Sequence, residues 1–62
     1  MLTAEEATLK AKALAEEIRP EVTFQPTAGK LWWIIEARVG WDLVEFFVDP
    51  ETGDIMRFGT RR

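Results

Sequence analysis

The segment Asp49–Asp54 (Asp-Pro-Glu-Thr-Gly-Asp) constrains the fold of this chain more than any other, because it consists almost wholly of residues that favour tight turns. Pro50 sets φ for the second position of a type I turn, Asp49 can accept hydrogen bonds from backbone amides ahead of it, and Gly53 can adopt the left-handed conformation that closes a loop. Apolar runs at residues 43–48 and 55–58 flank the segment. The pattern predicts a β-hairpin near the C-terminus.

A helix is predicted over residues 3–18. Thr3 and Glu6 have the spacing of a capping box, and the strong helix formers Ala, Leu, Lys and Glu dominate the interior. Pro20 is expected to end the helix. At 100° per residue one face is mostly alanine, which would let the helix lie close against a sheet. That face comprises Ala4, Ala7, Ala11, Leu14, Ala15 and Ile18.

Strands are predicted for most of the remaining chain. The expected order is a short strand at 22–25, a turn at 26–29, the longest strand at 30–39, a turn at 40–42, strands at 43–48 and 54–58, and a frayed tail at 59–62. The length allows one domain, residues 1–62. The expected fold is therefore α+β, with one N-terminal helix packed on a three- to four-stranded antiparallel meander.

Side-chain alternation divides the two long strands into two faces. The set expected to pack against the helix is Leu31, Trp33, Ile35, Ala37 and Val39, with Val44, Phe46 and Val48. The opposite side of the sheet, here called the outer face, carries Trp32, Ile34, Leu43 and Phe47 among the charged residues Lys30, Glu36, Arg38 and Glu45. The exposed side of an antiparallel sheet is usually polar, so four large apolar side chains there indicate an interaction surface.

The outer face is therefore the predicted binding or dimer interface, with Trp32 and Phe47 as anchors and the charged residues as its rim. Two alternatives remain open at this point. A one-residue error in the phase of one strand would exchange the faces. In the second alternative, the C-terminal tail or Trp41 covers the apolar side chains.

No catalytic, metal or cofactor site is predicted. The chain contains neither cysteine nor histidine, which removes thiolate ligands, a cysteine nucleophile and the commonest general base. The carboxylates of Asp49, Glu51 and Asp54 lie close in sequence, but they do not follow the spacing of an EF-hand and turn formation explains them. The glutamates of the helix are expected to be surface groups, and so small a domain is expected to have little room for a cleft.

Charge and hydropathy point away from nucleic acid and membrane. The net charge is −3, and the arginines at positions 57, 61 and 62 are expected to form a solvated tail. No apolar run approaches the roughly 20 residues of a membrane span. The acidic start of the chain does not resemble a signal peptide. As given, the chain is expected to be cytoplasmic; as an excerpt of a longer chain, it would be exported.

The long strand and the hairpin resemble the PepSY family. The resemblance lies in residues 30–37 (Lys-Leu-Trp-Trp-Ile-Ile-Glu-Ala) and 44–55 (Val-Glu-Phe-Phe-Val-Asp-Pro-Glu-Thr-Gly-Asp-Ile). It implies an N-terminal helix, a strand with an aromatic centre, an acidic Thr-Gly turn, and inhibition or binding of a peptidase or another protein without catalysis. Two departures are the lack of an export signal and a compact link between helix and long strand, which predicts a short or missing first strand.

Three functions remain open. The first is a non-catalytic protein-binding module, inhibitory or regulatory toward a partner enzyme such as a peptidase. The second is a self-associating structural domain, a homodimer through the outer face, which would also help a chain this small to reach stability. The third is a small phage-type inhibitor of a nucleic-acid enzyme, which only size and acidity support. No cofactor is expected in any of them.

Overall fold

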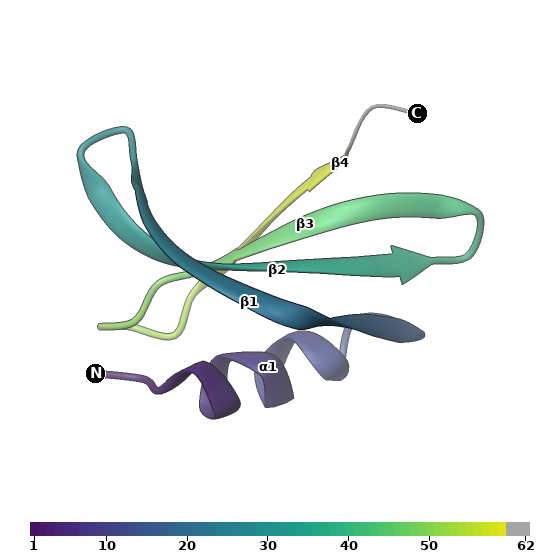
Figure 1. The fold of residues 1–62 in the computed structure, drawn as a ribbon, viewed down its shortest axis with the longest axis horizontal. Coiled ribbons are helices and arrows are strands. Elements are labelled where there is room, and N and C mark those ends of the chain that lie inside the picture. Colours follow the sequence, from purple (N-terminus) through teal and green to yellow (C-terminus); the bar gives the residue numbers. More distant parts are fainter. Residues whose placement is uncertain (60–62) are drawn as a thin grey trace.

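The computed structural model describes residues 1–59 and has one helix below a twisted sheet (Figure 1). The elements are α1 (Ala4–Lys12), β1 (Glu17–Thr27), β2 (Lys30–Val39), β3 (Asp42–Val48) and β4 (Ile55–Gly59). All neighbouring strands are antiparallel, and their order in the sheet, β1-β2-β3-β4, is that of a simple meander. The predicted α+β class, with a helix on a four-stranded antiparallel meander, is confirmed.

Helix α1 begins as predicted and ends six residues earlier. Thr3 is the N-cap: its hydroxyl accepts from the Glu6 amide at 3.2 Å, and the Glu6 carboxylate accepts from the Thr3 amide at 2.9 Å. The helix ends at Lys12, with Ala13 as its C-cap, so the predicted end at residue 18 is wrong. From Glu16 on, the chain joins the sheet instead, since the Glu16 amide donates to the Arg38 carbonyl at 3.1 Å and β1 begins at Glu17. Local helix propensity is overridden here by strand pairing.

Strand β1 is long, so the prediction of a short or missing first strand is also wrong. It pairs with β2 from Glu17↔Arg38 to Thr27↔Lys30, with a register shift between Ile18 and Val22. Pro20 lies inside that shift and β1 is an edge strand, the setting in which a sheet tolerates a residue without an amide hydrogen. Proline, which was expected only to end the helix, thus marks an irregularity in a strand.

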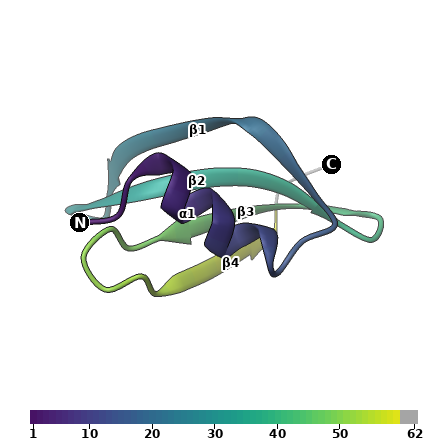
Figure 2. The ribbon, with the colours of Figure 1, turned by 90° about the horizontal axis from the view of Figure 1, so that it is seen from below.

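The core lies between α1 and the sheet, as the alternation predicted. Its buried residues are Ala7, Ala11, Ile35, Ala37, Val44, Phe46 and Val48. Figure 2 shows α1 crossing this side of the sheet. Trp33, Val39 and Ile18 pack around this core, whereas Leu31 and Leu14, both expected against the core, are about half exposed. Leu14 faces solvent because the helix has already ended, and Leu31 lies close to the β1–β2 turn.

The C-terminal strand is shifted by one residue from its prediction. It runs Ile55–Gly59 rather than 54–58, and Gly59 pairs with Val44. The fraying predicted for 59–62 is therefore wrong for Gly59. Its remainder, residues 60–62, lies outside the described residues.

Candidate functional site

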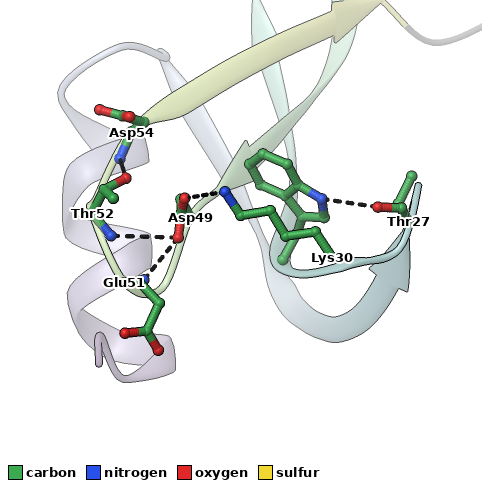
Figure 3. A network of polar contacts seen from close by, with 7 residues as sticks. Thr27, Lys30, Asp49, Glu51, Thr52 and Asp54 are labelled. Carbon is green, nitrogen blue, oxygen red and sulfur yellow. Dashed lines mark hydrogen bonds and ion pairs between the residues drawn. The ribbon is translucent and has the colours of Figure 1, made fainter.

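The Asp49–Asp54 turn forms as predicted and is organised by one carboxylate. Asp49 Oδ1 accepts from the Glu51 amide at 2.8 Å and from the Thr52 amide at 3.4 Å (Figure 3). The Gly53 amide donates to the Asp49 carbonyl at 2.8 Å, and Gly53 has φ of +81°. Only glycine adopts such a backbone at little cost, so Gly53 is the residue that lets the chain return as β4.

Asp49 also connects the turn to the sheet through Lys30. The Lys30 ammonium lies 2.5 Å from Asp49 Oδ2, and Asp49 is only 3% exposed (Figure 3). The ammonium, followed by the Glu51 amide, lowers the pKa of the Asp49 carboxyl from 3.8 to about 2, although burial opposes the shift. The sequence suggested the turn chemistry of Asp49; it gave no signal of this ion pair, which joins residues 19 positions apart.

Lys30 in turn orients Trp32. The ammonium lies 4.9 Å from the centre of the indole ring, within the range of a cation–π interaction. The indole N–H donates to the Thr27 carbonyl at 3.2 Å, and the ring meets Phe47 edge-on at 6.0 Å between centroids. Trp32 thus makes three contacts that restrain its ring, while the side chain remains only half-buried and accessible to a partner.

The four predicted contact residues all lie on the outer face, opposite the core. Their neighbours in the strands lie on the helix side: Ile35, Val44, Phe46 and Val48 belong to the core, and Trp33 packs against it. Their exposure differs, however. Trp32 and Phe47 are half-buried, Leu43 is 42% exposed, and Ile34 is 7% exposed. Ile34 is therefore a buried residue of the outer face, and the other three are accessible on its surface.

Strand β4 extends this surface with two residues that the sequence analysis missed. Met56 pairs with Phe47, and Phe58 pairs with Glu45, which places both on the outer face. They are 46% and 43% exposed, and the Phe58 ring meets Phe47 edge-on at 4.8 Å. Extending the alternation of side-chain faces across the Asp49–Asp54 turn into the last strand would have placed both residues on the outer face. Together Trp32, Ile34, Leu43, Phe47, Met56 and Phe58 form what we call the aromatic patch.

Charged residues border the patch; Lys30 pairs with Asp49, and Arg38 and Glu36 pair with residues of β1. Arg38 Nε lies 3.2 Å from Glu17 Oε1, and Arg19 Nε lies 3.9 Å from Glu36 Oε1. Both pairs are well exposed, so they contribute little to stability and remain available to a partner. Trp41 is 93% exposed and therefore does not cover the patch.

Two features of the described residues bear on catalysis: possible metal ligands and a groove beside α1. Among residues 1–59 no group of three or more acidic side chains is arranged to hold a metal ion. An open groove of about 550 Å³ lies beside α1, contrary to the expectation of little room for a cleft. It is lined by Ala4, Glu5, Thr8, Leu9, Lys12 and Val22, with one carboxylate and one ammonium and no second acid for proton transfer.

Comparison with known proteins identifies the family. The family described as PepSY, "Peptidase propeptide and YPEB domain", matches residues 1–58, almost the whole chain. The chain therefore belongs to the PepSY family, and the resemblance found in the long strand and hairpin is confirmed. PepSY domains are propeptide and inhibitor-type modules, generally non-catalytic, that occur in secreted or extracellular proteins.

Two further findings accompany the family match. Neither the curated proteins nor the solved structures yielded a match to this chain. Within the described part of the chain, no helix has the length and apolar character needed to cross a bilayer.

Proposed function

We propose that this chain is a non-catalytic protein-binding module that inhibits or regulates a partner enzyme such as a peptidase, and that it binds through the aromatic patch. The observation that carries the proposal is the row of contacting aromatic rings on the side of the sheet that the helix leaves open, formed by the half-buried Trp32 and Phe47 and the exposed Phe58. Partly exposed aromatic rings surrounded by charged residues are typical of binding hot spots.

The arrangement of Trp32 favours binding over incidental exposure. Its ring is held by the Thr27 carbonyl, the Lys30 ammonium and Phe47, so little side-chain freedom remains to be lost on association. The fold does not depend on this ring for its core, which lies on the other side of the sheet. Family membership supports a protein partner of the peptidase class.

Site-specific photo-crosslinking tests the proposal. A benzophenone analogue of phenylalanine replaces Phe58 in one sample and Leu9, which is 66% exposed on α1, in a matched control. Exposed to proteins of the source organism, the position 58 probe should capture a specific enzyme, whose activity the purified chain then lowers. Equal capture from both positions, or a captured protein whose activity is unaffected, would contradict the proposal.

The same experiment separates the homodimer alternative. A self-associating domain would give a product of twice the chain mass from position 58, and light scattering would show a mass that rises with concentration. The proposal predicts a monomer at the concentrations of the capture experiment.

We further propose that the module works outside the cytoplasm, as part of an exported protein. The occurrence of PepSY domains in secreted or extracellular proteins favours this over the cytoplasmic alternative. Fractionation of source cells with an antibody to the domain tests it, and recovery in the cytoplasmic fraction alone would contradict it.

A further inference from the structure

The two edges of the sheet differ in how well each could accept another strand. The β1 edge contains Pro20 and Pro26 and a register shift, which are features that block strand addition. Strand β4 contains no proline, and its pairing with β3 runs without interruption from Val48↔Ile55 to Val44↔Gly59. The β4 edge is therefore the more receptive of the two, and it borders the aromatic patch through Met56 and Phe58.

The hydrogen-bond pattern shows which groups of β4 face outward. The Asp49 amide donates to the Asp54 carbonyl at 2.8 Å, which makes this a hydrogen-bonded pair at the end of the β3–β4 ladder. Such pairs alternate along antiparallel strands, so Met56 and Phe58 direct their backbone groups toward β3. The backbone groups of Ile55, Arg57 and Gly59 then point to the open side of the sheet.

The side chains of β4 indicate which kind of partner segment this edge can bind. Arg57 pairs with the buried Phe46 and so lies on the helix side, yet it is exposed because α1 packs chiefly on β1, β2 and β3. No carboxylate within residues 1–59 forms a salt bridge with Arg57. Its neighbours Met56 and Phe58 lie on the opposite face. The edge therefore presents apolar, cationic and apolar side chains at three successive positions.

We propose that the partner adds an extended segment to β4, and that this segment carries an acidic residue between two apolar ones. In an antiparallel addition the acidic side chain lies opposite Arg57 on the helix side, where opposite charges on paired residues attract. The flanking apolar side chains join Met56 and Phe58 on the outer face and enlarge the aromatic patch. Main-chain hydrogen bonds to Arg57 provide affinity, and the alternating side chains provide selectivity. This inference deepens the proposed function and rests on it.

A second copy of the chain fits this edge less well in the register that uses Arg57 at its centre. A symmetric antiparallel pairing of two β4 strands centred on position 57 would place two arginines opposite each other, and like charges at paired positions are destabilising. An acidic segment of another protein has no such cost.

Short peptides test the inference by NMR on the ¹⁵N-labelled chain. The probe is acetyl-Thr-Val-Glu-Phe-Thr-amide, in which Val would face Phe58 and Phe would face Met56. It should shift the amide signals of residues 55–59 saturably, while those of β1 stay in place. A peptide with Lys in place of Glu should bind roughly three- to tenfold more weakly, and Arg57→Glu should reverse this preference.

Backbone methylation supplies a matched pair of probes. Methylation of the Glu amide removes a hydrogen bond to Arg57 and should abolish the shifts, whereas methylation of the Phe amide, which points away from β4, should be tolerated. Absence of saturable shifts, an unchanged preference in Arg57→Glu, equal effects of the two methylations, or concentration-dependent β4 shifts without peptide would each overturn the inference. If the position 58 probe still captures an enzyme that the chain inhibits, the proposed function survives and the edge-strand inference alone fails.

Discussion

Neighbouring phenylalanines in β3 provide a sharp test of how the two faces of the sheet divide their roles. Phe46 is 1% exposed and lies in the core under α1, whereas Phe47 lies half-buried on the outer face. The substitutions Phe46→Ala and Phe47→Ala remove the same atoms from adjacent positions of one strand. Their effects on the free energy of unfolding should differ because only the first opens a cavity in the core.

The magnitudes follow from burial. Truncating a fully buried phenylalanine to alanine costs about 3–5 kcal/mol. A chain of this length has a free energy of unfolding of roughly 3–9 kcal/mol, so Phe46→Ala should remove at least about a third of it and unfold a chain at the lower end of that range. Phe47→Ala loses two edge-to-face ring contacts, with Trp32 and Phe58, at about 0.5–1.5 kcal/mol each, together with part of its apolar burial. We expect a loss of at least about 1 kcal/mol that stays below the loss in Phe46→Ala, and a folded protein.

Urea denaturation followed by far-ultraviolet circular dichroism measures both variants. The dependence of the free energy on urea should be unchanged in Phe47→Ala, since the same surface is exposed on unfolding. If Phe47→Ala were as destabilising as Phe46→Ala, or more so, the outer face would be part of the structural core. The assignment of the aromatic patch to binding would then be wrong.

Further predictions concern the turn, the helix cap and the exposed tryptophan. The pKa of Asp49 is lowered from 3.8 to about 2 in the folded chain, so its ionised form stabilises the fold above about pH 4. This contribution is lost as the pH falls toward 2. Measurements of the free energy of unfolding at decreasing pH should show that Asp49→Asn lacks this pH dependence. Gly53→Ala should lower the free energy of unfolding, measured by chemical denaturation, by at least about 1–2 kcal/mol, because φ is +81° and the new Cβ would lie 3.0 Å from Lys10 Cε. Gly40→Ala should lower it by less, because φ is +63° and no atom lies within 4 Å of the new Cβ. Thr3→Ala should lower the free energy of unfolding by about 1 kcal/mol through loss of the N-cap, and an unchanged value would contradict the capping box. Trp41→Ala should change the free energy of unfolding by no more than about 0.5 kcal/mol, because its side chain is 93% exposed.

The sequence predicted those features that local chemistry determines. The capping box at Thr3, the turn at Asp49–Asp54 and the alternation along Lys30–Val39 each depend on residues close in sequence, and each was found in the structure. Alternation alone also places Trp32 and Phe47 on the outer face. These elements carry both the fold class and the candidate site.

Features that depend on contacts between distant residues were missed. Residues 13–18 have helical composition, but pairing of Glu17 with Arg38 extends β1 instead. The Lys30–Asp49 ion pair joins the start of β2 to the far turn, and neither residue alone indicates it. Met56 and Phe58 were overlooked because the prediction counted faces only in the two long strands, although the register of the hairpin places them beside Phe47.

Equilibrium titration of the captured enzyme with two tryptophan variants tests the central claim most directly. Trp32 lies in the aromatic patch, while Trp41 is more exposed but lies at the turn between β2 and β3. Binding through the patch predicts that Trp32→Ala weakens affinity by at least roughly tenfold, as expected for a hot-spot residue, and that Trp41→Ala binds like the unmodified chain. Equal affinities for all three proteins, or a loss confined to Trp41→Ala, would contradict the claim that this face of the sheet binds the partner.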